Sequence, residues 1–277
     1  MKPNLRTLHG CAPRSTGIAR RVTAMDPVLL VAEDGEAIVE RPRREVRVLF
    51  EHELLDASYA RSEGGERGAS PHIHLEHVDA FYIVEGELAF VVGPDLGVVR
   101  ASAGTFVMVP PNLVHGFDND SDATARWLNF HAPSTGFLGW MRGDRESFDM
   151  LPPPEGGGRS ADDAVIVRPG GGERYERSNR TISILGDEPR FSALDIAFDE
   201  SFHVDPHEHD DHADSFFVLD GEVEFTVGDE AVRAGPGTWL SAPPGARHGF
   251  RNGGSGRTRV LNVHAPDAGF ADWIRGL

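Results

Sequence analysis

The chain contains the same segment twice, and this repeat constrains its fold more than any other feature. Residues 71–81 return as residues 206–216, and residues 104–119 return as residues 237–252, with two residues fewer between the blocks in the second copy. A repeated unit of this length can bury a core of its own. The sequence therefore predicts two similar domains in tandem.

The ends of the repeated unit show where the domains divide. Each copy closes on the same block, at residues 128–133 and 261–266, followed by Gly-Phe, Trp and Arg-Gly. This ending predicts a short C-terminal helix in each copy, with Trp140 and Trp273 packing back on the domain. Pro-Pro-Pro and Gly-Gly-Gly runs between the copies are typical of a linker. We expect a flexible leader at residues 1–25, domains at residues 26–146 and 160–277, and a linker at residues 147–159.

Short runs of apolar and β-branched residues recur along each copy. Examples in the first copy are residues 80–84, 88–92, 105–109 and 126–131. Gly, Pro, Asp and Asn separate such runs roughly every 8–12 residues, which is typical of an all-β sandwich or barrel. Long stretches with a helical period are absent, so the predicted fold class is all-β.

The net charge of the chain limits the classes of partner that it can bind. The formal net charge is −17, and this negative field repels phosphate backbones and anionic membrane surfaces. No apolar run approaches the roughly 20 residues that span a bilayer. The first 25 residues lack the apolar stretch of a signal peptide, and the single cysteine, Cys11, permits no internal disulfide. We expect a cytoplasmic protein that binds neither nucleic acid nor membrane, with an organelle transit peptide as the alternative for the leader.

A histidine-rich block in each copy has the spacing of metal ligands. Residues two apart on a strand face the same side, so His72 and His74 project together. Asp79 follows after room for a tight hairpin, and His115 comes from a distant strand after a Pro-Pro turn. Three imidazoles and a carboxylate can converge on one divalent ion of Fe, Mn, Ni, Co, Zn or Cu, and spacing does not choose among these metals. The second copy repeats the set as His207, His209, Asp214 and His248.

These blocks resemble the two signature motifs of the cupin superfamily. The first motif is His-x-His, four residues, an acid, six residues and Gly; the second is Gly, five residues, Pro-x-Gly, two residues, His, three residues and Asn. The matching positions are His72, His74, Asp79, Gly86, Gly104, Pro110, His115 and Asn119 in the first copy, and His207, His209, Asp214, Gly221, Gly237, Pro243, Gly245, His248 and Asn252 in the second. The resemblance covers the chain after residue 26. It implies a bicupin, with two tandem double-stranded β-helix (jelly-roll) barrels that end in short helices.

Two departures from the motifs matter. The first copy has Asn112 where the motif has glycine, and asparagine tolerates the left-handed backbone that such a turn requires. Both copies have an aspartate, Asp79 and Asp214, where cupins usually have glutamate, and its reach is shorter by about 1.5 Å. Each aspartate therefore either ligates the metal or orients a metal-bound water. This difference weakens any transfer of activity from the glutamate-dependent oxalate decarboxylases.

Four phenylalanines share the predicted metal-facing side of their strands. Phe81 and Phe216 follow the aspartates by two residues, and Phe117 and Phe250 follow the last histidines by two. These rings either flank the metal as contacts for an apolar or aromatic substrate, or they only fill the barrel.

Four further histidines lie near the predicted ligands. His131 and His264 stand at a strand end, two residues after an asparagine. Each either contacts substrate and carries protons or satisfies backbone groups. His77 and His212 lie in the predicted hairpin turn, where we expect them to be exposed, with an additional metal contact as the alternative.

The resemblance to bicupins leads to three functional hypotheses. The first is a metal-dependent dioxygenase similar to the quercetinase-like bicupins, which acts on a small aromatic or enolisable substrate and uses Asp79 and Asp214 as metal ligands or as bases. The second is a non-oxidative metal-dependent isomerase, lyase or decarboxylase, because polarising a carbonyl needs the same ligands. The third is a protein that binds a small ligand or a metal without turnover. The sequence favours the first, and a homo-oligomer is compatible with all three.

Overall fold

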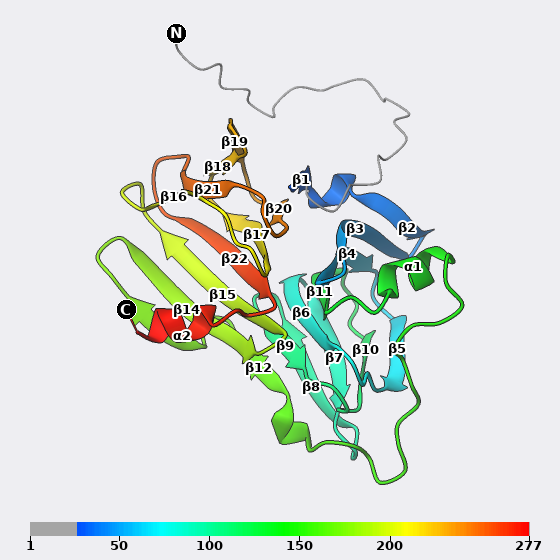
Figure 1. Ribbon diagram of the computed structural model, residues 1–277. Helices are drawn as coiled ribbons and strands as arrows, with labels where there is room; N and C mark the ends of the chain where they lie inside the picture. Colours follow the sequence, from blue (N-terminus) through cyan, green and yellow to red (C-terminus); the bar gives the residue numbers. More distant parts are fainter. Residues whose placement is uncertain (1–26, 277) are drawn as a thin grey trace.

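The computed structural model describes residues 27–276, which form two similar halves built mostly from strands (Figure 1). The predicted leader, residues 1–25, lies outside the described residues. Each half combines one seven-stranded sheet with one four-stranded sheet. The predicted all-β class with two tandem barrels is therefore confirmed. No helix among the described residues is long and apolar enough to cross a membrane.

The first half is a barrel of two antiparallel sheets. The large sheet has the strand order β12-β9-β6-β11-β4-β3-β2, and the small sheet has the order β5-β10-β7-β8. The strand bounds are β2 Glu36–Arg41, β3 Arg44–His52, β4 Leu55–Ser62, β5 Glu66–His72, β6 Val78–Glu85, β7 Glu87–Val92, β8 Gly97–Ser102, β9 Phe106–Val109, β10 His115–Asn119, β11 Ala125–Ala132 and β12 Val165–Val167.

The second half repeats this arrangement. Its large sheet has the order β1-β20-β17-β22-β15-β14-β13, and its small sheet has the order β16-β21-β18-β19. The strand bounds are β1 Val28–Val31, β13 Glu173–Glu176, β14 Arg180–Glu188, β15 Phe191–Phe198, β16 His203–His207, β17 Ala213–Asp220, β18 Val223–Val227, β19 Glu230–Ala234, β20 Thr238–Ala242, β21 His248–Asn252 and β22 Thr258–Ala265.

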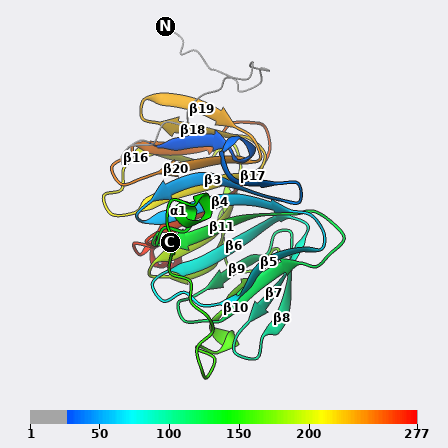
Figure 2. The same ribbon diagram turned by 90° about the vertical axis from the view of Figure 1, so that its right-hand side faces the viewer.

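The first strand of each half lies in the large sheet of the other half. β1 pairs with β20, with Val28 opposite Ser241, and β12 pairs with β9, with Val165 opposite Met108. Figure 2 shows β1 among the strands of the second half. The domain boundaries predicted near residues 146 and 160 stay a prediction, and strand pairing joins the two halves across them.

Strands in the middle of the large sheets are buried on both faces. On β6, Phe81 and Ile83 belong to the core inside the first barrel, whereas Ala80 and Tyr82 belong to the core between the two halves. A strand that is covered on both faces has a continuous apolar run in place of alternation. This double burial explains why the middle of β6 is apolar at successive positions.

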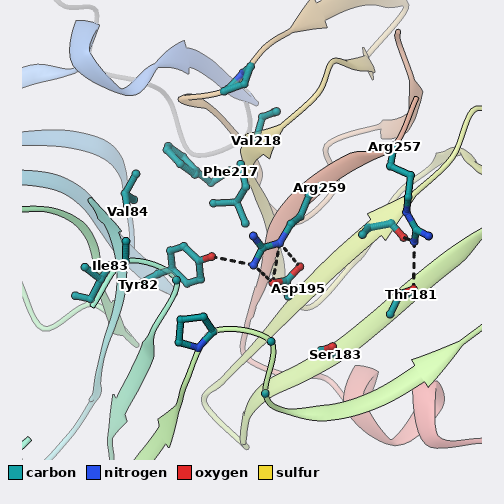
Figure 3. A pocket seen from close by; sticks show the side chains of 18 of the residues that line it. Tyr82, Ile83, Val84, Thr181, Ser183, Asp195, Phe217, Val218, Arg257 and Arg259 are labelled. Carbon is teal, nitrogen blue, oxygen red and sulfur yellow. Dashed lines mark hydrogen bonds and ion pairs between the residues drawn. The ribbon is translucent and has the colours of Figure 1, made fainter. Parts of the chain in front are cut away.

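Aromatic side chains join the two halves across the core between the large sheets. The ring pairs, with their centroid distances, are Tyr59–Phe217 at 6.2 Å, Phe106–Phe191 at 6.5 Å and Phe130–Trp239 at 5.9 Å. A groove opens between the halves beside this core, with Tyr82 and Phe217 in its wall (Figure 3).

A short helix follows the last strand of each half, as predicted: α1 is Phe137–Arg142 and α2 is Phe270–Arg275. Two short 3₁₀ turns, η1 Ala32–Asp34 and η2 Ala161–Asp163, complete the described elements.

The two helix tryptophans behave differently from the prediction that both pack back on their domains. Trp140 is half-buried and packs against Phe148 of the linker, with ring centroids 4.8 Å apart. Trp273 is 57% exposed, so the prediction for it is wrong. The buried face of α2 is formed by Ala271 and Ile274, which leaves the tryptophan on the solvent side.

The turn before the last motif histidine has the same backbone in both halves. Asn112 has a φ of 64° and Gly245, its counterpart, has a φ of 79°. The left-handed conformation predicted for Asn112 is therefore confirmed.

Trp239 tests the core between the halves, because its side chain is fully buried. We predict that Trp239→Ala lowers the free energy of unfolding by about 3–5 kcal/mol, since it leaves a cavity where the halves meet. Trp273→Ala is the matched control, and its expected cost is at most about 0.5 kcal/mol because the ring is mostly exposed. Urea denaturation followed by circular dichroism measures both, and equal losses would contradict the prediction.

Candidate metal centre

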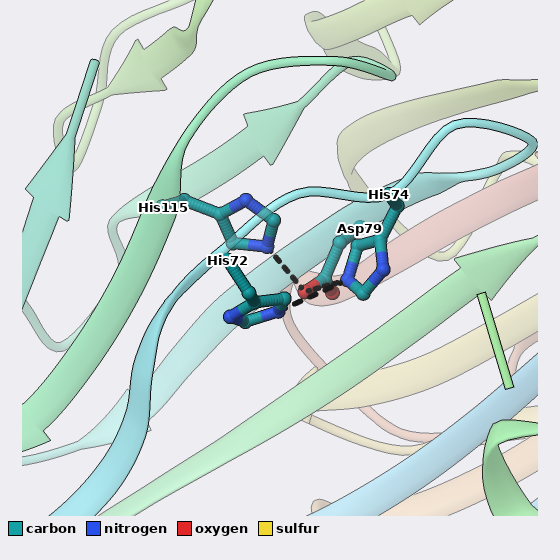
Figure 4. A group of neighbouring side chains, drawn as sticks. All are labelled: His72, His74, Asp79 and His115. Carbon is teal, nitrogen blue, oxygen red and sulfur yellow. Dashed lines mark hydrogen bonds and ion pairs between the residues drawn. The ribbon is translucent and has the colours of Figure 1, made fainter. Parts of the chain in front are cut away.

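Four side chains that can ligate a metal meet inside the first barrel (Figure 4). His72 is the last residue of β5 and His115 the first residue of β10, and the two lie opposite each other in the β5–β10 pairing. His74 comes from the loop after β5, and Asp79 from β6. All four side chains are buried, and their ligand atoms lie within 4.8 Å of one another.

Backbone carbonyls fix the orientation of the three imidazoles. Nδ1 of His72 and Nδ1 of His115 donate to the carbonyl oxygen two residues earlier in the chain, at 2.8 and 2.9 Å. Nδ1 of His74 donates to the carbonyl oxygen of Asp149. A carbonyl can only accept, so the hydrogen of each neutral ring is on Nδ1, and Nε2 carries a free lone pair. All three rings therefore direct an acceptor to the same point.

When all three rings are neutral, with the hydrogen on Nδ1, no hydrogen lies between the four ligand atoms. Nε2 of His72 lies 3.2 Å from Nε2 of His74, and Nε2 of His115 lies 3.2 Å from Oδ2 of Asp79. Burial, aided by the neighbouring imidazoles, lowers the pKa of His72 to about 4. Burial raises the pKa of Asp79, but the surrounding histidines outweigh it and hold that pKa well below its usual value.

Such a group of acceptors is repulsive unless a cation lies among them. Ligand atoms at 2.0–2.2 Å from one ion are themselves about 3 Å apart, which agrees with the two 3.2 Å separations. The nitrogen and oxygen donors of this set therefore fit a divalent transition-metal ion.

Asp79 uses its two oxygens differently. Oδ1 accepts a hydrogen bond from Nδ2 of Asn129 at 2.6 Å and lies 3.8 Å from Nε2 of His131. Oδ2 faces the histidines, at 3.2 Å from Nε2 of His115 and 3.7 Å from Nε2 of His74. This geometry favours direct ligation by the aspartate over the alternative in which it orients a water.

The second half brings its four predicted ligands together in the same way. Nε2 of His207 lies 3.1 Å from Nε2 of His209, and Nε2 of His248 lies 3.1 Å from Oδ2 of Asp214. An asparagine again holds the other carboxylate oxygen, at 2.6 Å. This site is more open, because 24% of the His209 side chain is exposed against 2% of His74.

A cavity of about 660 Å³ opens onto the first site. Six aromatic side chains belong to its wall, together with Arg41 and Arg44: Phe81, Phe117, Trp127, Phe137, Trp140 and Phe148. Both predicted phenylalanines of the first half thus line the same cavity as His72 and His74, and their contact with a substrate stays a prediction. In the second half, the ring of Phe216 lies 6.4 Å from that of His248 and 5.1 Å from that of Phe250.

His77 and His212 are buried, so the prediction that they are exposed is wrong. Their exposed fractions are 0% and 6%. The turn before β6 folds inward, and the ring of His77 packs 4.0 Å from that of His74. Burial is tolerated because a carboxylate accepts the Nδ1 hydrogen: Asp149 for His77, at 3.0 Å, and the adjacent Asp211 for His212, at 2.8 Å.

A chain of hydrogen bonds runs from Asp149 to Asn129 in the first half. Oδ2 of Asp149 lies 3.0 Å from Nδ1 of His77, and Nε2 of His77 lies 2.8 Å from Nδ1 of His131. Nε2 of His131 then lies 3.0 Å from Oδ1 of Asn129, the residue that holds Asp79. The predicted residue His131 is therefore part of a buried polar network behind the ligands.

The corresponding chain is interrupted in the second half. Nε2 of His264 lies 3.2 Å from Oδ1 of Asp214 and 3.2 Å from Oδ1 of Asn262. Nδ1 of His264 and Nε2 of His212 have no hydrogen-bond partner among the residues that the structure describes.

Residues 148–151 of the linker, called the strap here, cover the first site. The Asp149 carboxylate accepts hydrogen bonds from the backbone N–H groups of Leu75 and Glu76, at 2.9 and 2.7 Å. Leu151 bridges to Ile73, which lies between the first two histidines. The sequence analysis missed the strap. The available signal was the apolar content of residues 148–151 in a stretch otherwise rich in proline and glycine.

Comparisons with known proteins agree on the fold of both halves. The family model described as Cupin domain matches residues 58–131 and 198–264. Protein Ylba from E. coli has 12% identity and a TM-score of 0.65, covering 89% of this chain and 94% of that chain. A putative glyoxylate induced protein from Pseudomonas aeruginosa has 14% identity and a TM-score of 0.62, covering 95% and 96%.

Oxalate decarboxylase from Bacillus subtilis is also similar, with 14% identity and a TM-score of 0.58, covering 89% of this chain and 78% of that chain. At these identities the likeness shows the fold alone. A search of curated proteins found no match.

The buried His77 makes stability depend on pH in a defined window. Burial lowers its pKa from 6.5 to about 4. Between these values the unfolded chain binds a proton that the folded chain does not, so stability is lost as pH falls from 6.5 towards 4. We predict that, with a chelator present, His77→Gln removes up to about 3 kcal/mol of this pH-dependent loss.

The free energy of unfolding, measured by urea denaturation across this pH range, checks the prediction. His203→Gln is the control, because 63% of the His203 side chain is exposed. If His77→Gln left the dependence of the free energy of unfolding on pH unchanged, the loss of stability at low pH would arise from other groups.

Proposed function

Because the chain belongs to the cupin family, with a cupin domain in each half, we propose that it is a metal-dependent dioxygenase of the bicupin type. On this proposal each half holds one divalent transition-metal ion, and the first half acts on a small aromatic or enolisable substrate. The observation that carries the proposal is that one ligand atom from each of three imidazoles and a carboxylate lie within 4.8 Å of one another, while Nδ1 of each ring contacts a backbone carbonyl.

The ligands of the first ion are His72, His74, Asp79 and His115, and their counterparts hold the second ion. This donor set suits Fe, Ni, Mn, Co or Zn. A bound ion polarises a substrate oxygen and, where it is redox-active, permits reaction with dioxygen. The carbonyl contacts at Nδ1 hold the rings in place, so the ligands need little rearrangement when the ion binds.

The volume of the cavity and the aromatic rings in its wall favour an aromatic substrate over a very small one. About 660 Å³ lies within the usual range for small-molecule sites. The rings of Phe81, Phe117 and Trp127 can pack against a flat apolar body while an oxygen of the substrate reaches the histidines. Oxalate, the substrate in the name of one similar structure, would leave most of this cavity unfilled.

We assign turnover to the first half. Its ligands are buried and the strap packs beside them, so the reacting groups are better shielded from solvent than those of the second half. Removing water strengthens the electrostatic interactions inside a site. The greater exposure of His209 makes the second half less suited to this role.

One observation favours a non-oxidative reaction as the second candidate. The three contacts between Asp149, His77, His131 and Asn129 each need one hydrogen, because the oxygens at both ends only accept. Two neutral imidazoles supply two hydrogens, so the chain can take up one more. His131 lines the cavity, where it can exchange a proton with a substrate. Burial holds the pKa of His131 well below 6.5, so it is a weak base that readily returns the proton, as an isomerase requires.

We predict that the purified protein binds up to one transition-metal ion per half and that Asp79→Ala weakens binding in the first half more than Asn129→Ala. Loss of Asn129, which only orients the carboxylate, costs about 10–100-fold in metal affinity. Asp79→Ala removes a direct ligand, so it should lower the metal affinity by more than this. Elemental analysis and competition with a chelating dye measure these affinities.

Asp214→Ala is the matched control, because it changes the second half and leaves the first-half ion in place. Equal losses in Asp79→Ala and Asn129→Ala would argue against direct ligation by Asp79. Absence of metal after reconstitution with each of Fe, Ni, Mn, Co and Zn would contradict the proposal.

We predict oxygen uptake when the protein, reconstituted with Fe, Ni, Co or Mn, receives a flavonol or an enolisable diketone. Phe148→Ala opens the strap and should lower kcat/KM by about tenfold, because water enters the site. Trp273→Ala is the control, with activity unchanged. Turnover without oxygen uptake would favour the second candidate, and tight binding without turnover would leave a binding protein.

A further inference from the structure

The groove between the two halves is a second cavity, separate from both candidate metal centres. Its volume is about 660 Å³. Figure 3 shows Tyr82 and Phe217 on one side of it and Asp195, Arg257 and Arg259 on the other. None of the eight predicted metal ligands lines it.

The charged side chains of the groove are mostly cationic, although the chain as a whole carries a net charge of −17. Arg174, Arg257 and Arg259 line it, against a single carboxylate, Asp195. Asp195 accepts hydrogen bonds from Nε and Nη2 of Arg259. Arg257 donates to neutral oxygens among the described residues: Thr181 Oγ1 at 3.1 Å and a backbone carbonyl at 3.0 Å. Arg174 is paired with Glu176 at 2.9 Å and Arg259 with Asp195, so Arg257 is the arginine of the groove that bonds to no carboxylate among the described residues.

The first half shows which side chain lies at the position equivalent to the groove. Arg126 on β11 is the counterpart of Arg259 on β22. There, Oε1 of Glu33 lies 3.9 Å from Nε of Arg126, and the cavity that both residues line measures only about 270 Å³. The carboxylate of Glu33 thus occupies part of the space beside Arg126 that is equivalent to the groove.

The second half has no carboxylate at the position of Glu33, and its Arg259 is paired with Asp195 instead. Residues 28–36 and 165–173 are repeat counterparts, which puts Gly170 at the position of Glu33. A Cβ atom built on Gly170 would meet nothing within 4 Å, so the space is open. Glycine in place of glutamate removes one negative charge and the whole side chain, and the cavity is larger, at about 660 Å³ against about 270 Å³.

We propose that this groove binds a small organic anion, whose carboxylate lies where the Glu33 carboxylate lies in the first half. Arg257 holds the carboxylate together with Nη1 of Arg259, the guanidinium nitrogen that does not bond to Asp195, and the apolar part of the molecule packs against Phe217 and Tyr82. Charge-assisted hydrogen bonds to arginine are well suited to carboxylates. This site is independent of the proposed metal chemistry.

Benzoate is the probe, since it combines a carboxylate with an apolar ring, and benzyl alcohol is its neutral counterpart. Calorimetric titration of the full chain at low ionic strength should give saturable binding of benzoate and none of benzyl alcohol. Gly170→Asp places a carboxylate in the groove and should weaken benzoate binding by about tenfold. Gly170→Asn is the matched control, because asparagine has the same size and tolerates the same backbone without the charge.

A second pair of variants locates the site. Arg257→Gln should weaken benzoate binding by about tenfold, whereas Arg177→Gln, which removes an exposed arginine outside the groove, should not. Binding that Arg257→Gln leaves unchanged would place benzoate elsewhere, for example at a metal centre, and would overturn the proposal. Absence of saturable benzoate binding would overturn it as well.

Discussion

The candidate metal centre depends on four buried acceptor atoms that face one another with no hydrogen to share. Each unsatisfied buried acceptor costs about 1–3 kcal/mol, so the arrangement is unfavourable without a cation. The barrel imposes it through the β5–β10 pairing, which sets His72 opposite His115, and through the carbonyls that accept the Nδ1 hydrogens. A cation bound among these atoms would offset the repulsion between them.

The sequence could predict that these four side chains meet in each half, because three of them lie on strands and the fourth, His74 or His209, follows a strand by two residues. It could not predict the burial of His77, because that depends on Asp149, 72 residues away in a stretch with linker composition. It could not predict the exchange of β1 and β12 either. The two strands have similar apolar sequences, and a local pattern does not show which sheet edge they join.

The two halves share a fold but differ in what surrounds the repeated positions. The strap gives His74 a carbonyl acceptor and gives His77 a carboxylate, so the polar network behind the first site is continuous. In the second half, Asp211 supplies the carboxylate from a position that is 74% exposed, and the network is interrupted at His264. Repeated ligands therefore do not imply equal sites, because residues outside the repeat determine the enclosure of each one.

Repeated positions also differ in their surroundings at the groove between the halves. The register of β4 and β15 against their partner strands makes Tyr59 and Asp195 counterparts, since Tyr59 pairs with Leu128 and Asp195 with Leu261. Tyr59 packs on Phe217 across the core, whereas Asp195 holds Arg259 at the groove wall. One copy thus uses this position for apolar packing between the halves, and the other uses it to orient an arginine. Two differences between the copies therefore produce a charged groove beside an apolar core: Asp195 at the position of Tyr59, and Gly170 at the position of Glu33.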